Sequence, residues 1–487
     1  MTTMIRTLTT GLLVATLGFV AAAQKPDRSG PPKPGPAPVF TMPQAERFTL
    51  ANGLQVVLLE KHAVPLVQVN LIIRTGTAMD PAGKSGLASM TTAMMMEGAG
   101  TMDALQLADA IDFLGAQISV SAGMHSSSVD MSVPVSKLDA ALALQADVAL
   151  RPAFAQSELE RKRRSRLTSL VQWRDEPRTL ASIMFNRTLY GTGHPYGLSV
   201  MGDEASIRSM KVEDLRAFHA QYVKPGNAFL VVVGDVTVPQ MKEKLEKVFG
   251  AWQGKAGAPP ALGAITQVEK RTLTLIDKPG APQTEIRIGR IGAPRVTDDY
   301  YALTVMNTIL GGSFSSRLNQ NLREEHGYTY GASSGFQYRV LPGPFLAGAA
   351  VQSAVTDSSL IQFMKELQGI TATVPDAELE RAKNYIALGF PADFQTAGDL
   401  ASKLEEMVIY DLPADYYSQY VKRIQAVTAA DVQRVAKKYI DPAKMAIVMV
   451  GDRATIEAKV AAQKLAPVTN LTVEDVLGKA PVIEGTK

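Results

Sequence analysis

Residues 212–235 read VEDLRAFHAQYVKPGNAFLVVVGD, and residues 429–452 read AADVQRVAKKYIDPAKMAIVMVGD. The two stretches align without a gap, and five identities recur at one fixed separation along the chain. The pairs are Asp214 and Asp431, Tyr222 and Tyr439, Pro225 and Pro442, Gly234 and Gly451, and Asp235 and Asp452. Glu158-Leu159-Glu160-Arg161 also returns, as Glu378-Leu379-Glu380-Arg381. A repeat of this kind indicates that one structural unit is present twice.

Each copy of the repeat predicts a helix followed by a buried strand. In the first copy, Leu215, Phe218 and Tyr222 have the spacing of one apolar helix face. A proline follows and prevents the helix from continuing. The apolar runs 229–233 and 445–450 have the length of buried strands, and each is followed by Gly-Asp.

The rest of the chain predicts further strands and helices in both halves. An Asn52-Gly53 turn between apolar runs indicates a hairpin, because these residues tolerate the positive φ of a tight turn. Strands are predicted at 48–50, 54–59, 67–74, 117–122, 128–133, 272–276 and 284–288, and helices at 85–97, 103–114, 135–150, 155–173 and 300–310. The order predicts an α+β fold of two duplicated domains, each a mainly antiparallel sheet with helices packed on it.

The N-terminus is typical of a secretory signal. Arg6 precedes the apolar stretch Leu12–Val20, and the small residues Ala21–Ala23 follow, which predicts cleavage near Ala23. An uncleaved membrane anchor is the alternative, although the apolar run is short for a span of about 20 residues. We therefore expect a soluble protein exported to the periplasm. The expected division is a signal peptide at 1–23, a Pro-rich linker at 24–44, a first domain at 45–252, a linker at 253–264, a second domain at 265–470 and a tail at 471–487.

Composition excludes several kinds of site. The 487 residues contain no cysteine, which excludes disulfides, thiolate metal sites and a cysteine nucleophile. Lys plus Arg (50) nearly balances Asp plus Glu (47), so the charge does not predict nucleic-acid binding. None of the five histidines is three or four residues from another, so a local metal motif is absent; they are His62, His125, His194, His219 and His326. A site assembled from distant residues stays open. Met94–Met96 is expected to fill core space.

Four motifs carry a resemblance to a known family. They are LANGLQVVL (50–58), HPYG (194–197), YVKPGN (222–227) and GGSFSSRLNQNLREEHGYTYGASS (311–334). Together with the duplication they resemble the M16 peptidases, the pitrilysin or insulinase family, over about residues 45 to 460. The resemblance implies that the two domains form half of a clam-like chamber.

The zinc motif of that family is degenerate in this chain. Active members carry an inverted His-x-x-Glu-His motif on a helix of the first domain. The matching positions hold Ser89, Thr92 and Ala93, and the further glutamate ligand is expected near Thr168-Ser169. These side chains cannot ligate zinc usefully or act as a general base. The resemblance therefore implies no metal in this chain and zinc in a partner subunit.

The second domain keeps the family's other functional pair. Arg323 and Tyr330 match the spacing of an Arg and a Tyr that contact substrate and help to stabilise the reacting carbonyl. Tyr328 and Arg317 are the alternatives if the register differs. In related processing peptidases a Gly-rich segment contacts substrate, so Gly311 and Gly312 are further candidates. Without the family, Arg323 would read as a surface ion pair and Tyr330 as a strand aromatic.

The contrast between the two domains predicts a substrate-binding subunit that is inactive alone. Its expected partner is an M16 homologue with an intact His-x-x-Glu-His motif, and its expected substrate is a peptide. No nucleic acid and no stable membrane insertion are expected after signal cleavage. Two alternatives stay open: a structural or assembly subunit, and a peptide-binding pseudoenzyme without a partner.

Overall fold

The computed structural model describes residues 35–36 and 38–483. The chain divides into two units, residues 1–37 and 38–487, and the fold below is that of the second unit. The predicted signal peptide and most of the predicted Pro-rich linker lie outside the described residues. In the described part of the chain, none of the helices combines the length and the apolar character needed to cross a lipid bilayer.

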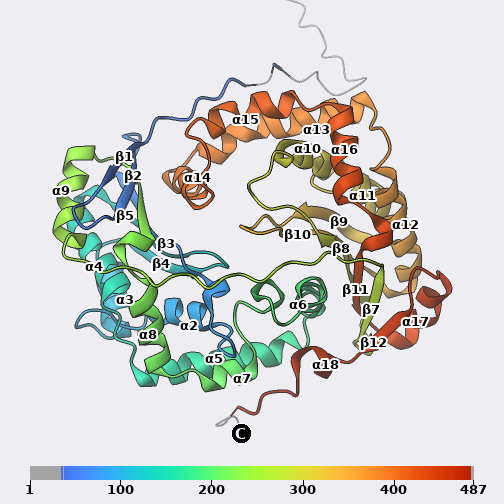
Figure 1. Cartoon of the computed structure of the whole chain (residues 1–487), viewed down its shortest axis with the longest axis horizontal. Coiled ribbons are helices and arrows are strands. Elements are labelled where there is room, and N and C mark those ends of the chain that lie inside the picture. Colours follow the sequence, from blue (N-terminus) through green and yellow to red (C-terminus); the bar gives the residue numbers. More distant parts are fainter. Residues whose placement is uncertain (1–34, 37, 484–487) are drawn as a thin grey trace, which may run out of the picture. The chain divides into compact units, whose positions relative to one another are not determined.

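The first sheet has six strands in the order β1-β2-β6-β3-β5-β4 (Figure 1). They are β1 Glu46–Thr49, β2 Gln55–Glu60, β3 Leu66–Ile73, β4 Gln117–Ala122, β5 Ser127–Pro134 and β6 Ala228–Gly234. Only the β2–β6 pair is parallel among the strand pairs of this sheet. The predicted hairpin is confirmed as β1–β2, and Gly53 supplies the positive φ of 88° at its turn.

The second sheet repeats this order as β12-β7-β11-β8-β10-β9. Its strands are β7 Thr272–Asp277, β8 Gln283–Ile291, β9 Thr329–Phe336, β10 Pro344–Gln352, β11 Ala446–Gly451 and β12 Val468–Leu471. Strands β7, β11, β8, β10 and β9 take the places of β2, β6, β3, β5 and β4. Strand β12 takes the place of β1 but pairs parallel. The predicted α+β fold of two duplicated, mainly antiparallel sheets is therefore confirmed.

Helices surround both sheets. In the first half they are α2 Leu87–Met94, α3 Ala104–Phe113, α4 Leu138–Leu150, α5 Gln156–Trp173, α6 Pro177–Tyr190, α7 Glu204–Ser209, α8 Val212–Tyr222 and α9 Val238–Phe249. In the second half they are α10 Tyr300–Leu310, α11 Arg317–Asn319, α12 Thr356–Gly369, α13 Asp376–Gly389, α14 Ala397–Ile409, α15 Tyr416–Gln425, α16 Ala429–Tyr439, α17 Arg453–Ala462 and α18 Val473–Leu477. Helices α8 and α16 begin and end at equivalent positions of the sequence repeat, so the predicted helix and strand are confirmed in both copies.

Each half covers one face of the other half's sheet. Helix α14 packs its apolar side chains on β3 and β6 of the first sheet, and α6 packs on β8 and β11 of the second (Figure 1). The opposite face of each sheet packs on helices of its own half. Strands β6 and β11 are therefore buried on both faces, which explains their continuous apolar sequences. This exchange of helices joins the two halves through apolar packing.

The two ends of the described chain also connect the halves. Near the N-terminal end, the ring of Phe40 lies 4.3 Å from that of Phe394 in the second half. At the C-terminal end, Arg174 Nη1 donates to the carbonyl of Gly478 at 2.7 Å, and Arg208 Nη2 donates to that of Val482 at 2.8 Å. These contacts come from arginines of the first half, so the C-terminal segment crosses from one half to the other.

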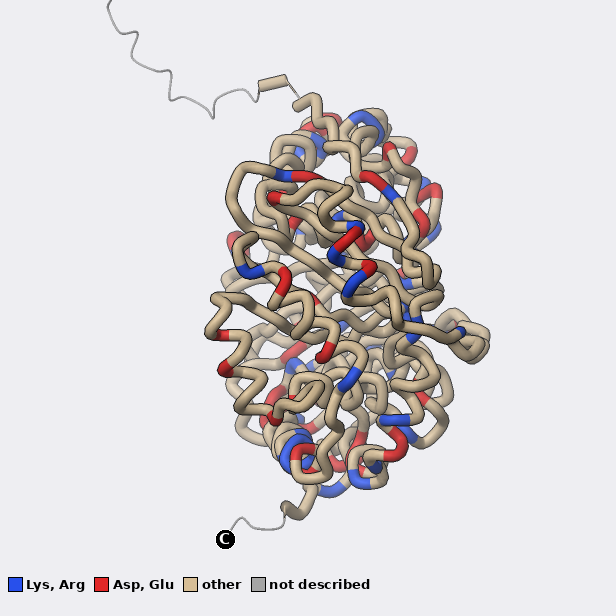
Figure 2. The backbone as a smooth tube through the Cα atoms, turned by 90° about the vertical axis from the view of Figure 1, so that its left-hand side faces the viewer, with Lys and Arg blue, Asp and Glu red and all other residues tan. Residues whose placement is uncertain are grey.

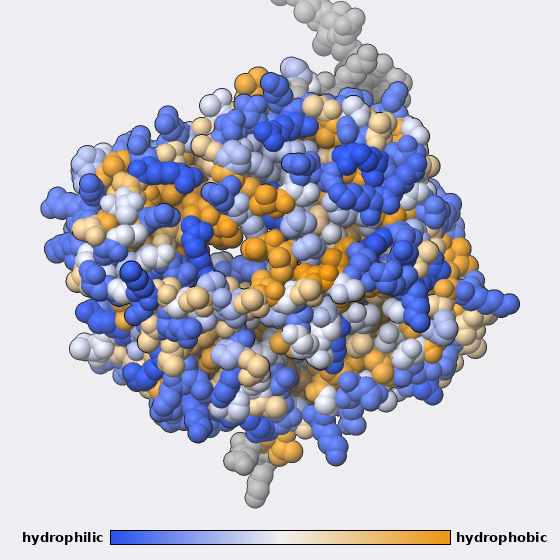
Figure 3. Space-filling model, viewed as in Figure 1, coloured by the Kyte–Doolittle hydropathy of each residue, from blue (hydrophilic) through white to orange (hydrophobic). Residues whose placement is uncertain are grey.

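The surface is mixed in charge. Acidic and basic residues are interspersed over the face in Figure 2, as the nearly balanced composition predicts. In the view of Figure 3, apolar side chains gather toward the middle of the face, while its periphery is mainly hydrophilic. No broad field of one sign stands out along the backbone in the view of Figure 2.

A buried carboxylate joins α10 to α16 and gives the fold an acid-sensitive contact. Asp299 accepts from Arg434 Nη1 at 2.6 Å, Lys438 Nζ at 2.8 Å and the Tyr439 hydroxyl at 2.9 Å. Burial alone would raise the pKa of Asp299. The hydrogen bonds from Lys438, Arg434 and Tyr439 outweigh burial and lower this pKa to about 2.

Replacing Asp299 with asparagine should reduce the free energy of unfolding by about 1–2 kcal/mol at pH 7. Because the folded pKa lies below the unfolded value of 3.8, the contribution is present above pH 4 and is lost as the pH falls toward 2. Urea unfolding at pH 7, 4 and 2.5 measures the effect. The neighbouring, exposed Asp298→Asn is the matched control and should change little at any pH. An equal loss at pH 7 and pH 2.5 would exclude the charge of Asp299 as the cause.

Candidate functional site

The positions of the degenerate zinc motif lie on α2, and their side chains are occupied locally. Ser89 Oγ donates to the carbonyl of Val200 at 2.6 Å, and Thr92 Oγ1 donates to that of Ala88 at 2.9 Å. Ala93 has no polar atom beyond its backbone. Thr168 and Ser169 on α5 donate their hydroxyls to carbonyls one turn earlier in their own helix. All of these hydroxyls are used within the fold.

An arginine and a loop occupy the N-terminal end of α2. Arg166, on α5, donates through Nη1 to the carbonyls of Gly86 at 3.2 Å and Met201 at 3.1 Å. Asp80 accepts from the backbone N–H groups of Gly86 and Ala88, both at 2.7 Å. Burial raises the pKa of Asp80 to about 7, against the effect of these donors and of Arg166, and burial lowers the pKa of Arg166 to about 10.

The residues at these positions do not fit a zinc ion. Zinc sites use imidazole, carboxylate or thiolate ligands, whereas this set offers four hydroxyls that already donate to carbonyls. A guanidinium lies beside the same helix end and supplies positive charge from the protein itself. Across residues 35–36 and 38–483, no three His, Asp or Glu side chains converge as metal ligands. The absence of zinc from this chain stays a prediction.

Arg323 lies on a short π-helix, η5 Gln320–Glu325, that leads into β9. Its guanidinium carbon stands 4.6 Å from the centre of the Phe314 ring, and its Nε is 3.5 Å from a carboxylate oxygen of Glu324. The side chain is about one-third exposed. A stacked guanidinium keeps the donors at its edge available, so Arg323 can donate to a carbonyl or carboxylate from outside the chain.

Tyr330 is presented to solvent by a β-bulge. Ala332 pairs with Ala349 while Thr329 pairs with Val351, so β9 advances three residues against two on β10. Strict alternation from buried Ala332 would place Tyr330 on the core face, but the extra residue turns it outward, where it is 91% exposed. Bulges re-aim side chains in this way next to active sites.

The Thr329 hydroxyl satisfies backbone groups that the bulge leaves unpaired. It donates to the carbonyl of Ala350 at 2.7 Å and accepts from the N–H of Gly331 at 3.1 Å. Buried or half-buried backbone groups need such partners, so this hydroxyl stabilises the local break in the ladder. The conformation that exposes Tyr330 is therefore built into the strand rather than being a frayed end.

Gly311 and Gly312 are explained by close packing. A Cβ on Gly311 would lie 2.4 Å from Ser334 N, and one on Gly312 would lie 2.8 Å from Asn307 Nδ2. Asn307 and Ser334 are themselves joined, because Ser334 Oγ donates to Asn307 Oδ1 at 2.8 Å. The glycine pair lets the loop after α10 approach β9. Contact of these glycines with substrate stays a prediction.

Asn319 connects the loop, the π-helix and the strand. Its Nδ2 donates to the carbonyl of Phe314 at 2.7 Å, and its Oδ1 accepts from the N–H of Ala332 at 3.2 Å. The first bond fixes the loop that carries the ring under Arg323. The second fixes β9 next to the bulge that carries Tyr330. One buried amide thus sets the relative positions of both predicted residues.

The two register alternatives occupy other surroundings. Arg317 Nε donates to Glu378 at 2.8 Å, so its charge is already paired. Tyr328 is half-buried against the second core, and its ring stacks on His326 at a centroid distance of 4.9 Å. Arg323 and Tyr330 are the more accessible pair, and their contact with substrate stays a prediction.

Comparisons with known proteins agree with this arrangement. Residues 55–204 match the family described as "Insulinase (Peptidase family M16)", and residues 209–386 match "Peptidase M16 inactive domain". The chain belongs to the M16 family. The predicted resemblance is therefore confirmed across both halves.

Relatives of this M16 chain carry both active and inactive descriptions. An uncharacterized zinc protease of Mycobacterium leprae is 28% identical over 347 residues, which is 70% of this chain and 76% of the relative. A "non-peptidase homolog YmxG" of Helicobacter pylori is 22% identical over 393 residues, covering 78% and 88%. The solved M16 inactive domain from Pseudomonas fluorescens is 28% identical, with a TM-score of 0.79. The match covers 84% of this chain and 98% of that structure's chain.

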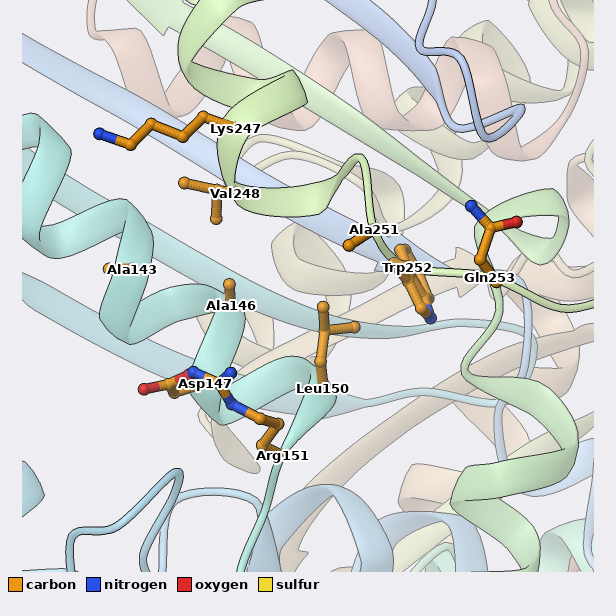
Figure 4. A pocket seen from close by; sticks show the side chains of 10 residues that line it. All are labelled: Ala143, Ala146, Asp147, Leu150, Arg151, Lys247, Val248, Ala251, Trp252 and Gln253. Atoms are coloured by element: carbon orange, nitrogen blue, oxygen red, sulfur yellow. The ribbon is translucent and has the colours of Figure 1, made fainter.

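A cavity in the first half of this M16 chain lies away from Arg323 and Tyr330. It has a volume of about 510 Å³, lies between α4 and α9 and is mainly apolar (Figure 4). It is lined by Ala143, Ala146, Asp147, Leu150, Arg151, Lys247, Val248, Ala251, Trp252 and Gln253. All but Gln253, the first residue of the predicted linker, belong to the first half. Arg323 and Tyr330 instead lie at the surface of the second half.

Proposed function

We propose that this chain is the peptide-binding subunit of a two-subunit M16 metallopeptidase and hydrolyses peptides only together with a zinc-bearing M16 homologue. The observation that carries the proposal is the contrast between the two halves. The side chains at positions 89, 92 and 93 do not fit zinc, while Arg323 and Tyr330 are held in accessible positions by Asn319 and by the bulge of β9. The proposed location is the periplasm, on the ground of the predicted signal peptide.

The chemistry available to this chain is hydrogen-bond donation. Arg323 offers rigid guanidinium donors for peptide carbonyls or a terminal carboxylate. Tyr330 offers a hydroxyl that can donate to a carbonyl oxygen as negative charge develops on it. The metal would belong to the partner, and no proton transfer is assigned to this chain. Its contribution is to bind and orient the peptide and to stabilise charge on the reacting carbonyl.

Strand β4 offers a further contact for an extended peptide. It ends the first sheet, and its backbone pairs with β5 on one side. An extended peptide can add to such an edge through backbone hydrogen bonds, which supports affinity without strict sequence preference. Exposed Gln117, Ser119 and Ser121 lie along this strand, so a peptide there would meet polar side chains.

Co-expression with a zinc-bearing homologue tests the proposal. A suitable homologue carries the intact His-x-x-Glu-His motif and comes from the same genome. The two chains should co-purify, and their mixture should hydrolyse an internally quenched peptide that neither chain cleaves alone. Co-purification without hydrolysis would favour a structural or assembly role. Peptide binding by this chain without any association would favour a pseudoenzyme that acts alone.

A further inference from the structure

Three segments far apart in the sequence meet at one buried hydrogen-bonded chain. His125 belongs to the turn between β4 and β5, Tyr196 to η3 Pro195–Gly197, and Leu341 to the turn between β9 and β10. The N–H of Leu341 donates to the Tyr196 hydroxyl at 3.2 Å, and that oxygen lies 2.6 Å from His125 Nε2. The contact therefore links the turns that follow the two edge strands, β4 of the first half and β9 of the second.

The contact has one arrangement in which the phenolic proton has an acceptor. Tyr196 accepts from the Leu341 N–H, and its own proton donates to His125 Nε2 when that nitrogen carries no proton. Burial raises the pKa of Tyr196 further above 10, so the phenol keeps its proton. A protonated His125 would instead donate into the Tyr196 oxygen, and the phenolic proton would lose its acceptor. Protonation thus reverses the bond between His125 and Tyr196 and leaves the phenolic proton without an acceptor.

The surroundings make that protonation more costly. The guanidinium of Arg339 lies 4.5 Å from the Tyr196 ring centre and 5.6 Å from that of Tyr190. Burial and the charge of Arg339 lower the pKa of His125 to about 4. The titratable groups that face this contact are Tyr196 and His194 on η3, Tyr190 on α6, Arg339 on the β9–β10 turn and Tyr410 at the end of α14.

His194 adds a second imidazole of the same kind. It is 6% exposed, and its Nδ1 accepts from the N–H of Tyr196 at 3.1 Å. Burial lowers its pKa as well. Both imidazoles are therefore neutral in the closed contact, with Arg339 as the cation. None of the facing groups named above is a carboxylate that could pair with a protonated His125.

We propose that His125, Tyr196 and the β9–β10 turn form an acid-sensitive latch between the two halves of the chain. At neutral pH the latch is closed and holds the edge strands β4 and β9 in a fixed relation. As the pH falls below the pKa of a free imidazole, His125 takes up a proton more readily in the open state than in the closed state. The open state therefore gains population. The turn that continues β9 then separates from η3. The latch does not depend on the proposed peptidase function.

Hydrogen exchange of the full mature chain tests the latch, because the Leu341 amide reports the bond to Tyr196. After correction for intrinsic exchange, the opening equilibrium of this amide should rise by about 10- to 30-fold between pH 7.5 and pH 5.0. His125→Gln keeps an acceptor for the Tyr196 hydroxyl but does not titrate, so its opening should change by less than about threefold. His62→Gln, at an exposed histidine elsewhere, should keep the full wild-type response.

Two outcomes overturn the latch. One is a wild-type amide whose opening is the same at both pH values, and the other is a His125→Gln protein that keeps the full response. If His125→Gln does not fold, an NMR titration of the imidazoles in the wild-type protein decides. His125 should remain neutral at pH 5, and titration near pH 6.5 would contradict the latch.

Discussion

Replacing Arg323 with alanine should lower kcat/KM of the proposed two-subunit enzyme by about 100- to 1,000-fold, equivalent to about 2.7–4 kcal/mol of transition-state stabilisation. The reason is that the guanidinium, stacked on Phe314 and about one-third exposed, is the cation proposed to act with Tyr330. Tyr330→Phe removes only the hydroxyl and should lower the rate by about 100-fold or more. Steady-state hydrolysis of a quenched peptide by the mixed subunits measures both effects.

Matched controls separate this role from a general effect on the surface. Arg164→Ala removes an exposed arginine of α5, and Tyr385→Phe removes the hydroxyl of an exposed tyrosine of α13; both should keep the wild-type rate. The Arg323 variant should still associate with the partner, as gel filtration of the mixture can show. Activity within threefold of wild type would refute the assignment. Loss of association would instead place Arg323 in the subunit interface.

Replacing Arg295 with methionine should reduce the free energy of unfolding by about 3 kcal/mol. The Arg295 side chain is 4% exposed, and its Nε donates to Glu406 of α14 at 2.6 Å. Its Nη2 donates to the Tyr416 hydroxyl at 2.9 Å, and its guanidinium carbon lies 4.0 Å from the Tyr300 ring centre. Removing one partner leaves the Glu406 carboxylate half-buried without its cation, and α14 loses one of the contacts that hold it to its own half.

Urea unfolding followed by circular dichroism measures this loss as a lower midpoint. Arg453→Met is the matched control, because Arg453 makes an exposed pair with Glu457 at 3.5 Å that should contribute less than about 0.5 kcal/mol. The double variant Arg295→Met/Glu406→Gln should recover part of the loss by removing the unpaired charge. If the single variant is as stable as the Arg453 control, the buried pair does not hold α14 in place.

Local sequence patterns are enough to predict the helix and strand of each repeated unit. The helical spacing of Leu215, Phe218 and Tyr222, the proline after it and the apolar run 229–233 predict α8 and β6, and the second copy predicts α16 and β11 in the same way. Period, length and turn residues act within a few positions of one another. These helices and strands can therefore be predicted without tertiary information.

Local sequence patterns do not predict that α14 and α6 each pack on the sheet of the other half. Leu400, Leu404 and Met407 have the spacing of an apolar helix face, but spacing does not state which sheet that face covers. The same holds for Leu180 and Phe185 of α6, which pack on the second sheet although they precede it in sequence. Long-range packing decides both placements.

The site likewise combines residues that the sequence predicts with an arrangement that it does not. The family spacing predicts Arg323 and Tyr330, whereas their presentation depends on features that no short pattern marks. The bulge appears only when β9 is paired with β10, since strict alternation would bury Tyr330. Asn319 joins the loop to the strand across sequence distances that spacing does not reveal. Arg166 reads from sequence as one charge in the run RKRRSR, and only its contact with Gly86 and Met201 places it beside α2.

The most direct test of the central claim is a zinc and activity measurement on the isolated mature chain. Metal content should be determined after dialysis against zinc, and hydrolysis of a quenched peptide should be followed with and without the zinc-bearing homologue. We predict far less than one zinc per chain, no hydrolysis by the chain alone, and hydrolysis by the mixture. One tightly held zinc per chain together with enzyme-like turnover in the absence of any partner would contradict it.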